Sequence, residues 1–293
     1  MIRRLIINAD DLGLTRGINM AVSECAEAGM LRSATLMANG AAFDHAVKIF
    51  GGREGFGTGI HFVLTGLRPV LPAERLAGLI GPEGFLPSGP LELLMKIGTR
   101  RSARDALRRE LFAQAEKVFD AGLTPTHFDS HKHVHLIPAV LDIVLEIAAR
   151  YSIKWIREPF EPDGSWRFSS DVQKGFRAEF AKQLCRSRLS GLARSAFRNR
   201  VRAAGIQTPA GVYGISFTGF MNQAVLKRLG AMVKPGLSEL MTHPGIVDAE
   251  LLGLKGRLLD SRATEKELLA STVTKGFFEK NSITFCHFGE GER

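Results

Sequence analysis

The 293-residue sequence predicts an α/β fold, a distorted (β/α) TIM-like barrel that forms a single domain with a helical insert. Short apolar, β-branched segments alternate with helix-like segments roughly eight times, as parallel β/α units do. A barrel is the commonest closed arrangement of such units at this length, and a doubly wound open sheet is the alternative. We therefore expect one barrel domain over residues 1–293, with a basic helical insert at about 160–210.

Strands are expected where short apolar runs lie between turn-forming residues. Their ranges are 3–8, 33–38, 57–64, 124–129, 153–157, 212–217, 237–242 and 282–288. Helical periodicity places helices at 17–29, 41–50, 102–121, 138–150, 221–232 and 264–279. Pro138 suits the first turn of its helix, and Thr264 with Glu267 has the spacing of a capping box. Two long segments, 66–90 and 160–209, interrupt the alternation, and loops of such length usually serve as lids or substrate walls.

Composition excludes several classes of protein. The chain is 45% hydrophobic, enough for a large core, yet no run approaches the roughly 18 apolar residues of a membrane span. The apolar segment 5–7 follows the start almost directly, so we expect no signal peptide. The cysteines, Cys25, Cys185 and Cys286, are widely separated and odd in number, which favours a reducing compartment. We expect a cytoplasmic protein.

The net charge of +9 is concentrated in two segments, 96–109 and 174–202. Solvated helical faces explain these segments as well as contact with an anionic surface such as lipid headgroups does. The second interpretation draws on apolar residues that interleave with the arginines, as in an interfacial helix. These are Leu184, Leu189, Leu192, Ala193, Ala196 and Phe197. The sequence thus leaves open a peripheral contact with the inner membrane face, and also a homodimer, whereas no nucleic acid is expected as a partner.

Polar residues follow four of the predicted strands, at the carboxyl ends where barrel enzymes carry their active sites. The first are Asp10 and Asp11. Adjacent side chains on an extended chain point to opposite faces, so we expect these carboxylates to divide two roles, metal binding and proton transfer. A lone Asp at such a place would more often cap the next helix. The second is His61, which lies within an apolar strand and by itself would be interpreted as a core residue.

The third group is the segment 127–135, with the sequence HFDSHKHVH. If it is extended, alternate residues share one face. These are His127, Asp129, His131, His133 and His135. Burying them without partners would be costly, whereas neutral imidazole is a good ligand for zinc and similar ions. A charged surface strand is the alternative. The fourth group contains His243, which could protonate a departing amine because the ordinary pKa of histidine lies near neutrality.

Five segments carry a further signal: LIINADDLGLTRGIN, RSATLMANG, GIHFVLTG, THFDSHKHVH and ELMTHPG. Together, and in this order, they resemble the YdjC-like carbohydrate deacetylases, a resemblance that extends from about residue 4 to 288. The resemblance implies a distorted β/α barrel that binds one divalent metal and hydrolyses the acetamide of an N-acetylated sugar.

Carried over by motif, the resemblance makes Asp11, His61 and His131 the metal ligands and Asp10 the catalytic base. His243 as general acid and Arg157 as an orienting partner of the carboxylates rest partly on analogy with other sugar deacetylases. Asp129 and His135 are expected to support the ligands or to contact substrate. One carboxylate with two imidazoles suits zinc, and also manganese, cobalt or nickel, while the family adds magnesium.

Within the family, the long chain, the basic insert and the segments RPVLP and GVYGISFTGFM resemble the branch associated with hopanoid biosynthesis. Members of that branch are expected to act on an N-acetylglucosaminyl hopanoid, a glycolipid, and chitooligosaccharide deacetylation is the alternative. A metal-dependent phosphoesterase would also gather Asp and His at strand ends, but it would need a second carboxylate-rich cluster for a two-metal site. A nucleic-acid-binding protein or membrane adaptor would explain the charge but not the histidines.

Overall fold

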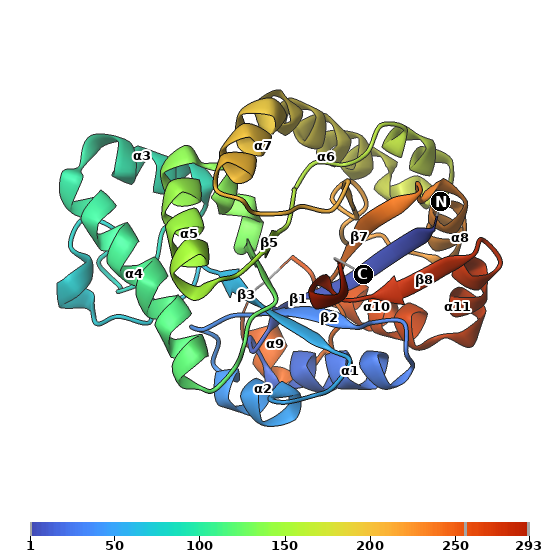
Figure 1. The fold of residues 1–293 in the computed structure, drawn as a ribbon, viewed down its shortest axis with the longest axis horizontal. Helices are drawn as coiled ribbons and strands as arrows, with labels where there is room; N and C mark the ends of the chain where they lie inside the picture. The colour runs from blue at the N-terminus through green and yellow to red at the C-terminus, as the bar shows by residue number, and fades with distance from the viewer. Residues whose placement is uncertain (1, 255–256, 292–293) are drawn as a thin grey trace.

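The computed structural model describes residues 2–254 and 257–291 and shows a curled parallel sheet surrounded by helices (Figure 1). The order of the strands is β5-β4-β3-β2-β1-β7-β6, and β8 also pairs with β1. Their bounds are β1 (Arg3–Leu12), β2 (Ser33–Leu36), β3 (Gly57–Phe62), β4 (His127–Ser130), β5 (Trp155–Ile156), β6 (Val212–Tyr213), β7 (Gly236–Thr242) and β8 (Ile283–Cys286). Each overlaps a range predicted from the sequence, and the predicted α/β fold is confirmed.

The sheet curls into an irregular barrel. A parallel bridge joins Trp155 of β5 to Gln207, and the backbone N–H of Val212 donates to the carbonyl of Phe160. The insert therefore links the two ends of the strand order. One further distortion lies at β1, whose residues Arg3–Ile6 pair with both β7 and β8. Strand β8 thus shares an edge of β1 with β2 and does not separate β7 from β1, as it would in a regular barrel.

Helices cover the outside of the sheet. Their bounds are α1 (Arg16–Glu27), α2 (Phe43–Phe50), α3 (Pro90–Thr99), α4 (Arg101–Asp120), α5 (Pro138–Tyr151), α6 (Arg177–Ser190), α7 (Arg194–Ala203), α8 (Gln223–Met232), α9 (Ala249–Gly253), α10 (Asp260–Ala270) and α11 (Thr272–Glu279). Pro138 begins α5, as predicted. The capping box is wrong, because Thr264 lies inside α10. The predicted helix at 264–279 is two helices, and the Ser271 hydroxyl caps the second.

The core is built around β1, where the successive residues Leu5, Ile6 and Ile7 are fully buried and point to alternate sides of the strand. Such burial on both sides of the strand is typical of a parallel sheet with helices outside it. Thr15 ends the turn after β1 and caps α1, because its hydroxyl accepts the N–H of Ile18. The turn between β1 and α1 is therefore fixed, and it holds the polar residues at the carboxyl end of β1 in place.

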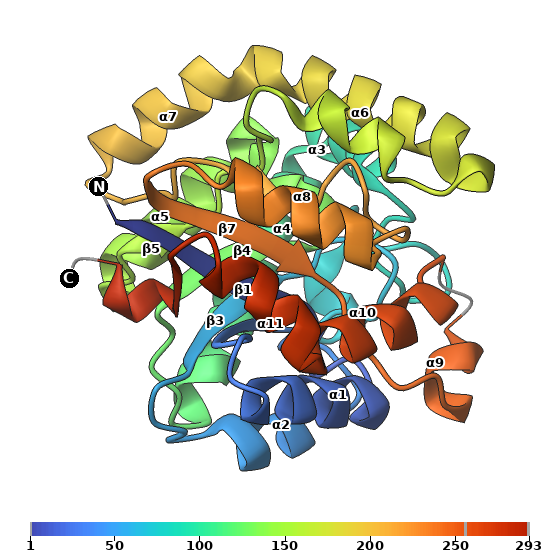
Figure 2. The same cartoon turned by 90° about the vertical axis from the view of Figure 1, so that its right-hand side faces the viewer.

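Helices α6 and α7 fall within the predicted insert, and Figures 1 and 2 show them on the opposite side of the sheet from α1 and α2. The predicted interfacial face holds only in part. Phe197 is buried against Phe160 and His135, and Leu184 packs partly on the core, whereas Leu189 and Leu192 are exposed. Across residues 2–254 and 257–291, no helix combines the length and the apolar character needed to cross a bilayer.

Candidate active site

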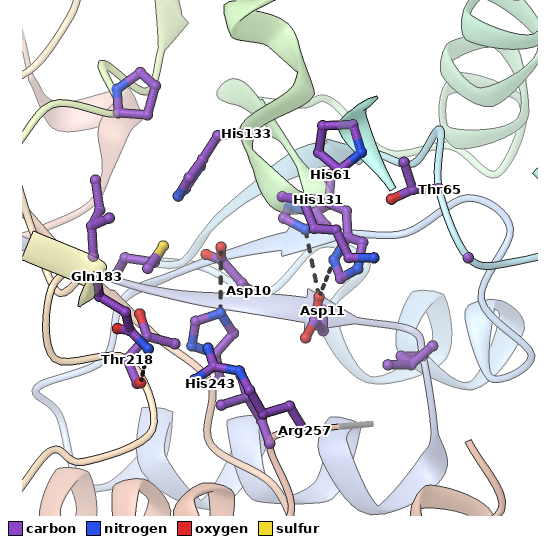
Figure 3. A pocket seen from close by; sticks show the side chains of 18 of the residues that line it. Asp10, Asp11, His61, Thr65, His131, His133, Gln183, Thr218, His243 and Arg257 are labelled. Carbon is purple, nitrogen blue, oxygen red and sulfur yellow. Dashed lines mark hydrogen bonds and ion pairs between the residues drawn. The ribbon is translucent and has the colours of Figure 1, made fainter. Parts of the chain in front are cut away.

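The carboxyl ends of β1, β3 and β4 bring together the three residues that the resemblance implied as metal ligands (Figure 3). Asp11 Oδ1 lies 3.5 Å from His61 Nε2 and 3.4 Å from His131 Nδ1. All three ligand atoms lie within 4.8 Å of one another. This spacing allows one small cation to contact all three.

Asp10 and Asp11 both line the same cavity, so the expectation that they face opposite sides is wrong. The cause is local: β1 is irregular between Ala9 and Leu12, and Asp11 has a φ of 64°. A left-handed conformation breaks the alternation of side chains and costs a non-glycine residue about 1–3 kcal/mol. The turn is supported by the N–H of Leu14, which donates to the Asp11 carbonyl. The two carboxylates nevertheless have different partners.

His61 is oriented by Asp129. Its Nδ1 lies 2.6 Å from Asp129 Oδ1, so a proton on Nδ1 leaves the Nε2 lone pair facing Asp11. Burial opposes the charged imidazole, but the Asp129 carboxylate outweighs it and raises the pKa of His61 to about 9. A carboxylate behind a ligating histidine is a common device for fixing its tautomer and raising its basicity. Asp129 thus contacts one of the expected ligands, His61, directly.

Arg157 is fully buried and joins three carboxylates. Its two Nη atoms each lie 2.6 Å from an oxygen of Asp10, Nη1 also lies 2.6 Å from Asp129 Oδ2, and Nε donates to Glu239 Oε1 at 2.7 Å. Burial raises the pKa of Asp10, but the charge of Arg157 outweighs it and lowers that pKa below its usual range. Burial raises the pKa of Glu239 to about 7 against the pull of Arg157. Arg157 is therefore in contact with the carboxylates that it was expected to orient, whereas Glu239 belongs to a motif in which the sequence analysis gave it no role.

A second group, Asp10, His61 and Asp129, also has ligand spacing. Both of its carboxylates already accept from Arg157, and it shares His61 with the first group. By contrast, Asp11 Oδ1 is buried and has no hydrogen-bond partner among the described residues. An unpaired carboxylate oxygen facing two imidazole nitrogens fits a divalent cation, so the first group is the better site. The shared histidine also argues against two separate metals.

Helix α10 contributes two buried residues that the sequence analysis did not identify. Arg262 donates to Asp11 Oδ2 and so leaves Oδ1 for a ligand, and Glu265 Oε2 accepts the backbone N–H of His243 at 2.6 Å. His243 Nε2 lies 4.0 Å from Asp10 Oδ2. Burial lowers the pKa of His243 to about 4, which keeps it neutral at pH 7. In the sequence, Arg262 and Glu265 are an ordinary Arg and Glu three residues apart, and nothing in the sequence indicates that both are buried.

The histidines after β4 do not share one face, because the chain leaves the strand after Ser130. A 3₁₀ segment, His131–Leu136, follows, in which Lys132 and His133 are left-handed. His133 lines the cavity, whereas His135 is buried outside its lining with Nδ1 2.5 Å from Ser130 Oγ. His127 is a core residue that contacts Asn8 Oδ1 and stacks on Phe288. The extended conformation predicted for this segment is therefore wrong beyond Ser130.

The site lines a cavity of about 1010 Å³. Asp10, Asp11, His61, His131 and His243 line it together. Both long segments flagged in the sequence contribute walls: 66–90 supplies Gly66, Leu67 and Pro90, and the insert supplies residues of α6. The cavity is large enough to admit more than a single small group.

Comparisons with known proteins agree with this architecture. The family model described as YdjC-like protein matches residues 4–280. A carbohydrate deacetylase of Brevibacillus brevis is 31% identical over 98% of this chain and 99% of that protein. A carbohydrate deacetylase of Thermoanaerobacter pseudethanolicus is 26% identical over 97% of each chain. A chitooligosaccharide deacetylase of Enterobacter sp. strain 638 is 38% identical over 52% of this chain and 58% of that protein.

A solved structure supports the fold. A protein of Enterococcus faecalis V583, named for cellobiose-phosphate cleavage, has a TM-score of 0.77 at 20% identity and covers 98% of both chains. At that level of identity the similarity concerns the fold alone.

Proposed function

The chain belongs to the family of YdjC-like proteins, and on that premise we propose that it is a metal-dependent carbohydrate deacetylase, an amide hydrolase that releases acetate from N-acetylated sugars. One observation carries the proposal: Asp11, His61 and His131 meet beside Asp10 and His243 in the lining of a large cavity. The relatives that match nearly the whole chain are named as carbohydrate deacetylases, which supports the same reaction.

The metal would be held by Asp11 Oδ1, His61 Nε2 and His131 Nδ1. When bound, it would polarise the acetyl carbonyl and make the attacking water more acidic. The donor set suits zinc, manganese, cobalt or nickel, and magnesium is the family's further candidate.

Asp10 is the proposed base. Arg157 grips both oxygens of this carboxylate and so fixes its direction. Because Arg157 lowers the pKa of Asp10, the carboxylate is ionised at neutral pH and can accept a proton, although the same shift makes it a weaker base. His243, neutral and 4.0 Å away, is placed to receive that proton and to donate it to the departing nitrogen. Asp10 would take its proton from the attacking water as the water oxygen bonds to the acetyl carbon. The carbon–nitrogen bond then breaks as the nitrogen takes the proton from His243, and acetate and a free amino sugar leave.

Short N-acetylglucosamine oligosaccharides are the proposed substrates. The name of the Enterobacter relative supports this class, as does a cavity that extends well beyond the ligand group. The second candidate is an N-acetylglucosaminyl lipid such as a glycosylated hopanoid. Leu189 and Leu192, which are 61% and 85% exposed beside basic residues of the insert, favour it.

The test is acetate release by metal-reconstituted wild type and by His131→Ala. The substrates are N-acetylglucosamine, its di- and trisaccharide, and an N-acetylglucosaminyl lipid. Release from the soluble sugars that is lost in the variant supports the main proposal, and release from the lipid alone moves the substrate to the second candidate. Absence of acetate from every substrate, with metal bound, overturns the deacetylase and favours a phosphoesterase, which a phosphate ester panel would detect.

A further inference from the structure

Helix α6 presents one polar stripe to the cavity. Its lining residues recur at spacings of three and four, which places them on a single helical face. They are Glu179, Lys182, Gln183, Arg186, Ser187 and Ser190, here called the α6 stripe. Polar residues on an inward helical face need partners, and a cavity beside them offers room for a hydroxylated ligand.

The α6 stripe is held firmly in place. Phe180, on the same helix, is buried in the core, and Leu184 packs against it. Gln183 donates to the carbonyl of Thr218, and the opposite orientation of its amide would instead join Ile215, Ser216 and Arg257. In either orientation, Gln183 ties the insert to the segment after β6. A wall fixed in this way can present polar groups without a large ordering cost.

Figure 3 shows where this wall stands: Gln183 and Thr218 lie on one side of the cavity, His61 and His131 on the other, with Asp10 and His243 between them. A substrate whose acetamide reaches Asp11 and His131 would therefore extend toward α6. Several other lining residues are apolar. These include Leu14, Met37, Leu136, Pro159, Met241 and Leu254. A pyranose ring has apolar faces and a hydroxylated edge, so it matches a cavity with apolar walls and one polar stripe.

Two members of the stripe have groups available for such a ring. Ser187 is 8% exposed and lines the cavity, and within the described part of the chain its hydroxyl has no recorded hydrogen bond. Arg186 lines the cavity and forms no recorded ion pair with the described residues. On the basis of the proposed function, we propose that the α6 stripe is a subsite for the sugar ring that follows the N-acetylated ring. Arg186 and Ser187 are its specificity-determining residues.

The experiment compares Arg186→Gln and Ser187→Ala with Arg188→Gln, a matched control on the same helix but outside the cavity lining. We measure kcat and KM for N-acetylglucosamine and di-N-acetylchitobiose, and calorimetric binding of both sugars to wild type and variants. The first two variants should lower kcat/KM for the disaccharide about 3- to 10-fold, mainly through KM, which is the effect of one lost hydrogen bond. The kcat and KM of Arg186→Gln and Ser187→Ala for the monosaccharide should equal those of wild type. Those of Arg188→Gln should equal wild type for both sugars.

Three results would overturn the subsite: equal losses for both sugars, equal losses in the Arg188 control, or no loss at all. Calorimetric binding measurements separate failure of the proposed subsite from failure of the proposed reaction. If wild type releases no acetate but binds the disaccharide more tightly than the monosaccharide, and Arg186→Gln removes that preference, the subsite stands and the chemistry fails. If wild type binds both sugars equally or neither, the subsite is overturned as well.

Discussion

Asp11 has its two carboxylate oxygens in different environments, one paired with Arg262 and one without a partner among the described residues. A guanidinium donates in a fixed plane, which a lysine ammonium cannot reproduce. Arg262→Lys should therefore weaken metal binding about 10-fold or more, since groups that orient a ligand have effects of that size. Zinc titration against a chelator of known affinity measures it. Arg228→Lys, which alters an Arg–Asp171 pair outside the cavity lining, is the control. Equal zinc affinities of Arg262→Lys and Arg228→Lys would contradict a role of Arg262 in orienting Asp11.

The His61–Asp129 pair predicts how metal binding depends on pH. His61 has a pKa of about 9 in the metal-free protein, so below pH 9 a metal must displace its proton. The apparent affinity should rise as pH rises from 6.5 to 8.5, by about tenfold per unit for one released proton. The same raised pKa stabilises the metal-free fold below the ordinary pKa of histidine, a contribution lost as pH rises through about 9.

Asp129→Asn removes the charge that raises the pKa of His61, so the rise in metal affinity with pH should become shallower. Calorimetric titrations of the protein with metal, at three pH values and in buffers of different ionisation enthalpy, measure two quantities. These are the slope of metal affinity against pH and the number of protons released on binding. An unchanged slope in the variant would show that Asp129 does not set the protonation of His61.

At the scale of elements, the strands and most helices followed from the pattern of apolar residues, because that pattern reports burial, whereas α3 and α9 were not predicted. The conformations at the strand ends did not follow from that pattern. Asp11, Lys132 and His133 adopt positive φ without being glycine, and although Asp and His do so more often than most residues, their identity alone does not predict it. The family resemblance implied Asp11, His61 and His131 as the ligands, and the structure brings them within ligand distance of one another, while the turn that brings Asp10 and Asp11 into one cavity had to come from the structure.

Strand β3 offers a test of how tightly the barrel is packed behind the site. A Cβ on Gly59 would meet the His127 ring at 2.5 Å, so Gly59→Ala must push apart β3 and β4. We expect a loss of about 1–3 kcal/mol in the free energy of unfolding, as for other overpacked cores. Gly98→Ala is the matched control, because nothing lies within 4 Å of its new Cβ in α3. Urea denaturation measures both variants, and equal midpoints would show that β3 and β4 separate at no cost.

At the scale of the whole molecule, the comparisons establish the family but do not identify whether the N-acetylated sugar is a soluble oligosaccharide or is linked to a lipid. The insert has two sides: the α6 stripe faces the cavity, and Leu189 and Leu192 face outward among basic residues. The two candidate substrates make different predictions for the outward side. Exposed leucines flanked by arginines bind anionic bilayers by both apolar burial and charge, and a lipid-linked substrate would use such binding.

If the lipid is the substrate, the protein should sediment with phosphatidylglycerol vesicles and not with phosphatidylcholine vesicles, and high salt should release it. The double variant Leu189→Ser/Leu192→Ser should lose this binding, since both side chains are largely exposed and their removal leaves the core intact. Its activity on di-N-acetylchitobiose should stay that of wild type, because neither leucine lines the cavity. Wild type that stays in the supernatant with both vesicles would exclude bilayer binding through this surface. The net charge of +9 would then be a property of solvated helical faces.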